Sequence, residues 1–333
     1  MEQTYLGRTG LVVSELCLGT MTFGGAADEA TSRAIVERFR AAGGTFFDTA
    51  DIYNAGASEQ ILGRIVAAER DQVVIATKGH GVTGPGPNDR MSSRRHLARA
   101  VDDSLRRLGT DWIDLYQLHA WDPTTPLEET LSTLEDMVRA GKVLHVGVSN
   151  FTGWQIERAA RIQEARGWDP IVALQPQWSL VERLIEHETL PAAYANGLGI
   201  LAWSPLAAGF LTGKYRREES REDIAGRGRF AQWVDNIDER GWAVLDAVRE
   251  IADAHGVEPA TVAVAWLLTR PRCVPIVGAT RPEQLDASLA AAALELTEQD
   301  VARLDELSAP RSGYPWDFGT WPGRPARPDW GAP

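Results

Sequence analysis

Short apolar runs rich in valine, isoleucine and leucine alternate with helical stretches along most of the chain. Strand-like runs are predicted near residues 15–20, 45–48, 73–78, 112–119, 143–149, 171–175, 200–203 and 273–277. Helical stretches are predicted near residues 31–42, 58–68, 93–108, 127–140, 154–165, 186–196 and 261–268. Alternating strands and helices predict a parallel sheet with crossover helices. The β-branched strands are typical of a sheet that is buried on both faces.

The number of strand–helix units favours a closed barrel. Eight strands in 333 residues fit one (β/α)8 TIM-barrel domain over residues 1–333, with about 80 residues to spare beyond the typical 250 or so. Residues 5–13 hold two β-type pieces around a glycine-containing turn, which predicts an N-terminal hairpin. The alternative is an open doubly wound sheet, which favours a Gly-x-Gly-x-x-Gly turn after its first strand. Residues 19–24 supply no such turn, so we expect the barrel.

Two segments do not fit the repeat. Residues 213–238 are charged and too long for an ordinary connection, which indicates either a functional loop or a disordered one. The aromatic-rich C-terminal tail, residues 309–333, mixes Tyr314, Trp316, Phe318, Trp321 and Trp330 with prolines and glycines. Because so many aromatic side chains are rarely left wholly in water, we expect the tail to pack over the barrel mouth; the alternative is that it covers an outer face.

Composition narrows the functional classes. The net charge is -12, with 44% hydrophobic and 24% charged residues. This balance argues against nucleic-acid or anionic-membrane partners. Cys17 and Cys273 are too few for a disulfide framework or a cysteine-rich metal site. The first residues lack the pattern of a signal peptide, and no apolar run approaches the roughly 18 residues of a membrane span. We expect a cytoplasmic protein without a metal centre.

Four polar residues lie at or just after the ends of predicted strands. Asp48, Lys78 and His119 each close an apolar run, and Tyr53 follows Asp48 by five residues. In a parallel barrel these strand ends meet in one mouth, where such folds carry out their chemistry. A lysine ammonium beside a phenol makes the phenol a better proton donor, and a carboxylate can balance the buried ammonium. The set therefore predicts protonation of a carbonyl oxygen, with hydride supplied by a cofactor.

Several motifs then resemble the aldo-keto reductase superfamily. Residues 47–53 read Phe-Asp-Thr-Ala-Asp-Ile-Tyr and are followed by Ser58-Glu59 and Leu62-Gly63. Further matches lie at residues 141–143, 147–150, 203–207, 209, 211–214 and 275–279. The resemblance runs from the hairpin to about residue 307. It implies a barrel that binds NADPH without a Rossmann domain and reduces aldehydes or ketones to alcohols.

The resemblance also assigns roles to residues. Tyr53 would be the general acid, Lys78 and Asp48 its supports, and His119 the group that orients the carbonyl. Ser149, Asn150 and Gln175 would hold the nicotinamide carboxamide, and Trp203, where relatives usually carry tyrosine, would stack on its ring. The other residues assigned to the cofactor are Gly19, Thr20, Met21, Asp48, Ser204, Pro205, Leu206, Gly209, Leu211, Gly213, Lys214, Gly278, Thr280, Arg281, Gln284 and Ser288. Of these, Gly278, Thr280, Arg281 and Gln284 would open the last helix and meet the adenosine phosphate.

Departures from the family pattern leave the cofactor and the substrate open. NADPH-selective members often carry Lys or Arg in place of Gly278 and Asn in place of Ser288. A preference for NADPH over NADH therefore depends on Arg281 in this chain. We expect Phe23, Tyr53, Trp121 and Trp178 to line the substrate pocket.

Three functions stand at this point: a broad carbonyl reductase, a narrow biosynthetic ketoreductase of the sugar or pyridoxal type, and a cofactor-sensing regulatory subunit with negligible turnover. The sequence does not specify the oligomeric state.

Overall fold

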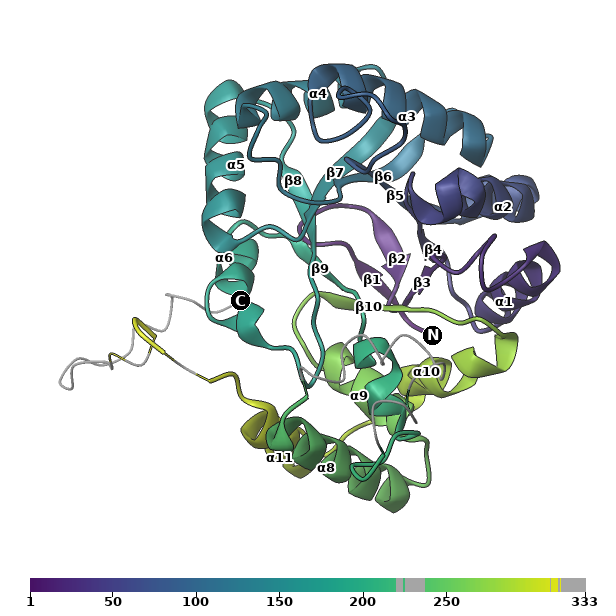
Figure 1. The fold of residues 1–333 in the computed structure, drawn as a ribbon, viewed down its shortest axis with the longest axis vertical. Helices are drawn as coiled ribbons and strands as arrows, with labels where there is room; N and C mark the ends of the chain where they lie inside the picture. The colour runs from purple at the N-terminus through teal and green to yellow at the C-terminus, as the bar shows by residue number, and fades with distance from the viewer. Residues whose placement is uncertain (220–223, 225–236, 312, 317, 319–333) are drawn as a thin grey trace.

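A closed barrel of parallel strands forms the centre of the molecule (Figure 1). The computed structural model describes residues 1–219, 224, 237–311, 313–316 and 318. Each strand pairs in parallel with its neighbours in the order β10-β3-β4-β5-β6-β7-β8-β9. The strands are β3 Cys17–Gly19, β4 Phe46–Asp48, β5 Val74–Gly79, β6 Ile113–Leu118, β7 Val143–Ser149, β8 Ile171–Gln175, β9 Gly199–Ala202 and β10 Cys273–Val277. The predicted (β/α)8 barrel is confirmed.

Helices surround the barrel on its outer face. They are α1 Glu29–Ala41, α2 Ala57–Val66, α3 Arg94–Leu108, α4 Leu127–Arg139, α5 Gly153–Arg166, α6 Thr189–Ala195, α8 Glu239–His255, α9 Pro259–Leu268, α10 Asp286–Ala290 and α11 Glu298–Ser308. The sequence analysis did not name α8 or α11. The helix predicted over residues 186–196 divides into a 3-10 turn, Leu184–Glu186, and the shorter α6. No helix of the described segments combines the length and apolarity needed to cross a membrane.

The N-terminal hairpin closes one end of the barrel. Strands β1 Gln3–Tyr5 and β2 Val12–Ser14 pair antiparallel, as the sequence predicted. Leu6 and Val13 are fully buried and join the inner core, which the strands fill with inward side chains such as Phe46. Gly7 adopts a left-handed conformation (φ 56°), and a Cβ there would lie 2.6 Å from the backbone nitrogen of Gly199. This contact requires glycine because no side chain fits between the hairpin and β9.

A second, larger core lies between the strands and the surrounding helices. Phe39 of α1 packs edge-to-face on Phe47 of β4, with ring centroids 5.5 Å apart. The side chain of Trp266 from α9 is fully buried and packs edge-to-face on Trp178, at 6.0 Å. These contacts fix the helices against the barrel, so the positions of the loops at its mouth are set by packed elements.

Two predictions on irregular segments fall largely outside the described residues. These are the loop over residues 213–238, of which 220–223 and 225–236 are not described, and most of the tail. In the described part of the tail, Trp316 stacks on His187 in the loop between β8 and α6, with ring centroids 4.9 Å apart. Tyr314 and Phe318 remain exposed. That the tail covers the mouth stays a prediction.

Candidate active site

The centre of the site is a buried ion pair at the carboxyl ends of two adjacent strands. Asp48 ends β4, and its Oδ1 lies 2.5 Å from the Nζ of Lys78 in β5. Both side chains are almost completely buried, and the ammonium also donates to the Thr49 carbonyl oxygen at 2.8 Å. Burial alone would lower the pKa of Lys78, but the charge of Asp48, helped by Tyr53, raises it overall. Lys78 therefore carries its charge inside the barrel.

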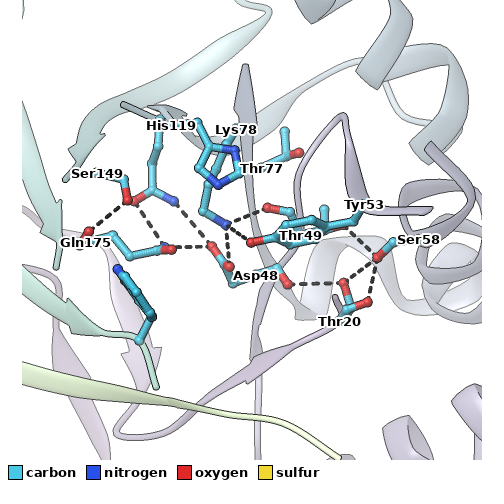
Figure 2. A network of polar contacts seen from close by, with 12 residues as sticks. Thr20, Asp48, Thr49, Tyr53, Ser58, Thr77, Lys78, His119, Ser149 and Gln175 are labelled. Atoms are coloured by element: carbon cyan, nitrogen blue, oxygen red, sulfur yellow. Dashed lines mark hydrogen bonds and ion pairs between the residues drawn. The ribbon is translucent and has the colours of Figure 1, made fainter. Parts of the chain in front are cut away.

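Tyr53 lies directly beside this charge (Figure 2). Its hydroxyl is 3.3 Å from Lys78 Nζ, and the ammonium lies 5.0 Å from the centre of the phenol ring. Tyr53 begins the 3-10 turn Tyr53–Gly56, in which Asn54 and Ala55 have positive φ. The Asn54 amide donates to the carbonyl oxygens of Met21 (2.9 Å) and Phe23 (2.7 Å), which ties the Tyr53 turn to the loop after β3.

His119 completes the predicted group of four. It follows β6, and its backbone N–H donates to the Gly79 carbonyl oxygen at 3.0 Å. Its imidazole meets the Tyr53 ring edge-to-face at 5.9 Å. Burial, together with the positive charge of Lys78, lowers the pKa of His119 to about 3. The imidazole is therefore neutral near pH 7 and can act as a hydrogen-bonding group but not as a cationic acid.

Two glutamines extend the network behind the ion pair. Gln175, at the end of β8, donates to Asp48 Oδ2 at 2.8 Å, and Gln117 in β6 approaches the same oxygen at 3.3 Å. Gln117 stands in register with Lys78 on the neighbouring strand. The sequence analysis missed Gln117, because it lies within an apolar run rather than at its end. Both glutamine amides donate to Oδ2 of Asp48, whereas Lys78 binds Oδ1. The carboxylate is therefore held in one orientation.

A hydroxyl cluster holds the start of α2 against the strand ends. Ser58 Oγ lies 2.8 Å from Thr20 Oγ1 and 2.9 Å from Thr49 Oγ1. Thr20 in turn bonds the Asp48 carbonyl oxygen through its N–H at 2.8 Å. Thr20 is fully buried, and its N–H and carbonyl oxygen are both hydrogen-bonded within the protein, so its predicted cofactor role stays a prediction. Figure 2 shows this cluster on the Tyr53 side of the ion pair.

The groups predicted to hold the nicotinamide lie at or just after the carboxyl ends of β7, β8 and β9. Ser149 donates to the Gln175 carbonyl oxygen at 2.8 Å, and the exposed Asn150 donates its amide to the His119 carbonyl oxygen at 3.0 Å. The indole N–H of Trp203 donates to Asn150 Oδ1 at 3.2 Å. An amide with both a donor and an acceptor beside a partly exposed flat ring fits a carboxamide attached to an aromatic heterocycle.

The loop after β9 carries an unusual run of left-handed backbone. Ser204, Ala207 and Ala208 have φ between 47° and 57°, and Gly209 and Gly213 also have positive φ. Such turns can orient backbone N–H groups toward an anion.

A cationic side chain lies over this turn. A Cβ built on Gly209 would be 3.6 Å from the exposed Lys214 ammonium. Together the two features fit a pyrophosphate. Pro205 and Leu211 are buried, and Leu206 is partly buried, so they shape the loop.

The predicted adenosine-phosphate end follows β10. Thr280 donates through its N–H to Gln284 Oε1 at 2.8 Å, and Arg281 is exposed with no ion pair to a described residue. The expectation that these residues open the last helix was wrong. They open a 3-10 turn, Pro282–Leu285, and α11 comes later. Gly278 is exposed, whereas the Ser288 side chain is buried.

Two of the predicted substrate-pocket residues belong to the core. Phe23 is fully buried, and Trp178 is 2% exposed with its indole N–H bonded to Glu186 at 2.8 Å. Neither side chain offers surface to a substrate in this structure, because packing against the surrounding helices has taken them inward. Trp121 is partly exposed, and it packs edge-to-face on Phe151 and Trp154 at 5.3 Å each.

The fold and these groups define a barrel enzyme of carbonyl chemistry. A phenol beside a charge-balanced ammonium and a neutral imidazole can protonate or deprotonate an oxygen at the mouth of the barrel. Among the residues that the structure describes, no cluster of histidine, cysteine and carboxylate side chains could hold a metal ion. These residues cannot supply a hydride themselves, so hydride transfer requires a cofactor.

Comparison with known proteins identifies the class. The aldo/keto reductase family profile matches residues 15–309. "Uncharacterized oxidoreductase YrpG" of Bacillus subtilis is 40% identical over 92% of this chain and 96% of its own length. "Versiconal hemiacetal acetate reductase" of Aspergillus parasiticus is 32% identical over 95% and 99%. "Aryl-alcohol dehydrogenase [NADP(+)]" of Phanerodontia chrysosporium is 32% identical over 92% and 86%.

The chain therefore belongs to the aldo/keto reductase family. It is an oxidoreductase that acts on the CH–OH/C=O group of a small-molecule substrate. Enzymes of this family use nicotinamide cofactors.

Proposed function

We propose that the protein reduces apolar aldehydes or ketones to alcohols with NADPH, and that Tyr53 supplies the proton. The observation that carries this proposal is the 3.3 Å contact between the Tyr53 hydroxyl and the Lys78 ammonium. Lys78 is neutralised on its other side by Asp48, so its positive charge is stable inside the barrel. A phenol in this position is a stronger acid than a phenol in water.

Each protein group has one task in the reaction. Tyr53 donates its proton to the carbonyl oxygen as negative charge develops there. Lys78 stabilises the phenolate that remains, and Asp48 keeps Lys78 charged and oriented. His119, neutral because of its low pKa, donates a hydrogen bond to the same oxygen and fixes its direction. Bound NADPH supplies the hydride.

The cofactor would lie across the mouth from β7 to β10. Ser149 and Asn150 would hold the nicotinamide amide and Trp203 its ring. The left-handed turn beside Lys214 would hold the pyrophosphate. Arg281 supports NADPH over NADH, because its exposed guanidinium has no ion-pair partner among the described residues and suits a 2′-phosphate.

Exposed apolar side chains around the mouth support a bulky, apolar substrate. Outside the tail, most of the exposed large apolar side chains of the described chain lie in segments that follow barrel strands: Met21, Ile52, Val82, Trp154 at the start of α5, and Leu184 in the 3-10 turn before α6. Such segments line the catalytic end of a barrel. Exposed apolar groups gathered at one site indicate a binding surface. A polyhydroxylated sugar would find few hydrogen-bonding partners there, so this rim disfavours the narrow sugar-reductase alternative.

Substitution of Tyr53 by phenylalanine tests the proposal. NADPH oxidation is followed with aromatic and aliphatic aldehydes, a dicarbonyl, pyridoxal and an aldose. Tyr53→Phe should lose about 10²–10⁴-fold in kcat, because the proton donor is gone, while NADPH binding stays intact. Tyr5→Phe is the matched control, since Tyr5 lies in the hairpin at the other end of the barrel and is 63% exposed.

Each alternative has its own outcome. Equal turnover by Tyr53→Phe and the unmodified protein would remove Tyr53 as the proton donor. Preference for pyridoxal or the aldose would point to the narrow ketoreductase. Tight NADPH binding without turnover of any carbonyl would favour the regulatory subunit.

A further inference from the structure

A second cluster of buried charges lies directly behind Tyr53 and Lys78. Asp51, two residues before Tyr53, is 3% exposed, and its N–H donates to the Lys78 carbonyl oxygen at 3.1 Å. Neither carboxyl oxygen of Asp51 forms a hydrogen bond of normal geometry with a described residue. An ionised carboxylate that is buried without donors is costly, since it has lost water and gained nothing in exchange.

The two cations whose charges act on this carboxyl group, Arg107 and Lys78, are already paired with other acids. Glu59 of α2 is fully buried and accepts from Thr77 Oγ1 through Oε1 and from Arg107 Nε through Oε2, both at 2.6 Å. Arg107 reaches this position from the end of α3 and is the ion-pair partner of Glu59. On the β6 side, the buried hydroxyl of Tyr116 also lacks a hydrogen-bond partner in the described part of the chain. Within that part, no side chain forms a hydrogen bond or an ion pair with Asp51, and the backbone N–H of Ile52 gives its negative charge only partial support.

The balance of buried charges also leaves one acid without a cation. The buried acids of the two clusters are Asp48, Asp51 and Glu59, and the cations that face them are Lys78 and Arg107. Each cation is paired with one acid, so three carboxyl groups share two positive charges. One acid is left over, and Asp51 is the one without a partner among the described residues. Like charges held close together in a buried site do not all ionise.

We propose that Asp51 is a positioning residue that holds a proton in the resting enzyme, and that its neutral form keeps Tyr53 a strong proton donor. Ionised Asp51 would add a negative charge near Lys78 and Tyr53. That charge would oppose formation of the phenolate, and the acid strength of Tyr53 would fall. Asp51 touches neither substrate nor cofactor in this scheme. It acts only through Lys78 and Tyr53.

The electrostatic surroundings of Asp51 set the pH range in which it holds its proton. Burial, with repulsion from Glu59, raises the pKa of Asp51 to about 7, while Arg107, the Ile52 N–H and Lys78 oppose the shift. Because the pKa is raised, the neutral form dominates below about pH 7 and is lost as the pH rises through that value. Reduction should therefore decline across neutral pH, through an acid that is not the proton donor itself.

Asp51→Asn tests this without removing the side chain's shape. The variant is permanently uncharged at this position, so the fall of kcat/KM between pH 6 and pH 8 should disappear. Asp253→Asn, which changes an exposed acid on α8, is the matched control and should keep the fall.

An infrared pH-difference spectrum of the unmodified enzyme detects the proton on the Asp51 carboxyl group directly. The C=O band of a protonated carboxyl group should be lost from pH 6 to pH 8. The spectrum of Asp51→Asn should lack that band change, and the spectrum of Asp253→Asn should retain it.

A titration of Tyr53 separates this proposal from the proposed function, on which it rests. The tyrosinate absorbance of each protein is compared with that of its Tyr53→Phe counterpart, which isolates the Tyr53 phenol without any turnover. Asp51→Asn should lower the pH at which Tyr53 ionises by about one pH unit, because the opposing negative charge is gone. An unchanged Tyr53 titration, or an infrared band change that survives Asp51→Asn, overturns the proposal. A shifted titration in a protein that reduces no carbonyl leaves Asp51 in its role and rejects the proposed function alone.

Discussion

At the scale of single residues, the site depends on a lysine that remains charged without contact with water. Lys78 has three partners, the Asp48 carboxylate, the Thr49 carbonyl oxygen and the Tyr53 hydroxyl. An ammonium has three hydrogen-bond donors, so all of them are used. Of these three partners, the Tyr53 hydroxyl is the one that can give a proton to a carbonyl oxygen at the mouth of the barrel.

Arg281 is the residue on which the choice of cofactor depends. Arg281→Ala should weaken NADPH binding by about tenfold or more and leave NADH binding nearly unchanged, because only NADPH carries the 2′-phosphate that a guanidinium would bind. Dissociation constants from fluorescence titration with each cofactor provide the measurement. Equal weakening for both cofactors would show that Arg281 does not contact the 2′-phosphate.

Residue positions differ in how far the sequence could predict them. Asp48 and Lys78 could be identified because each is a polar residue at or near the end of an apolar strand. Gln117 could not, since its approach to Asp48 depends on the register between β5 and β6. The isolation of Asp51 was equally hidden, because it results from the pairing of Glu59 with Arg107 across two helices.

At the scale of elements, the close contact between α2 and α3 holds the buried acid cluster in place. Gly63 of α2 lies against the end of α3, where an added Cβ would be 2.2 Å from the Leu108 carbonyl oxygen. The helices can approach this closely only because Gly63 has no side chain. Ser58 and Glu59 are carried by the same helix, so its position also sets theirs.

Gly63→Ala should therefore destabilise the protein by about 1–3 kcal/mol, because the helices must separate to admit a methyl group. Gly10→Ala is the matched control: an added Cβ there meets nothing within 4 Å. Urea unfolding followed by circular dichroism measures both variants. Equal unfolding midpoints for the two would mean that α2 and α3 adjust without cost.

Among the elements, the alternating strands and helices were the most predictable part of the chain. Their apolar periodicity is local and continues through each unit. α8 lies beyond the irregular segment that interrupts this alternation, and the sequence analysis passed over it although Trp242, Leu245 and Val248 recur at helical spacing and are buried. The residues around Arg281 were expected to open the last helix, but they open a 3-10 turn that leads directly into the short α10, and α11 follows later.

At the scale of the whole molecule, the hairpin supports the barrel from the end opposite the site. Leu6 is fully buried in the inner core beside the strands. Leu6→Ala should lower the free energy of unfolding by about 2–5 kcal/mol, because it leaves a cavity in that core. Turnover per folded molecule should stay unchanged, since the chemistry lies at the far end.

Tyr5→Ala in the same hairpin is the control for this prediction. Tyr5 is 63% exposed, so its loss should change stability by about 0.5 kcal/mol or less. Urea unfolding gives the free energies, and NADPH oxidation at 25 °C gives the turnover. A large loss of turnover in folded Leu6→Ala would show that the two ends of the barrel are coupled.

The closed lower end has a consequence for the order of events in a reaction cycle. Leu6 and Val13 fill the bottom of the barrel, so everything that reaches Lys78 enters through the mouth and leaves by the same route. A long dinucleotide lying across that opening would have to arrive before the smaller carbonyl compound and depart after the alcohol. A barrel that is open at one end alone would therefore impose an ordered sequence of binding and release on the cofactor and the substrate.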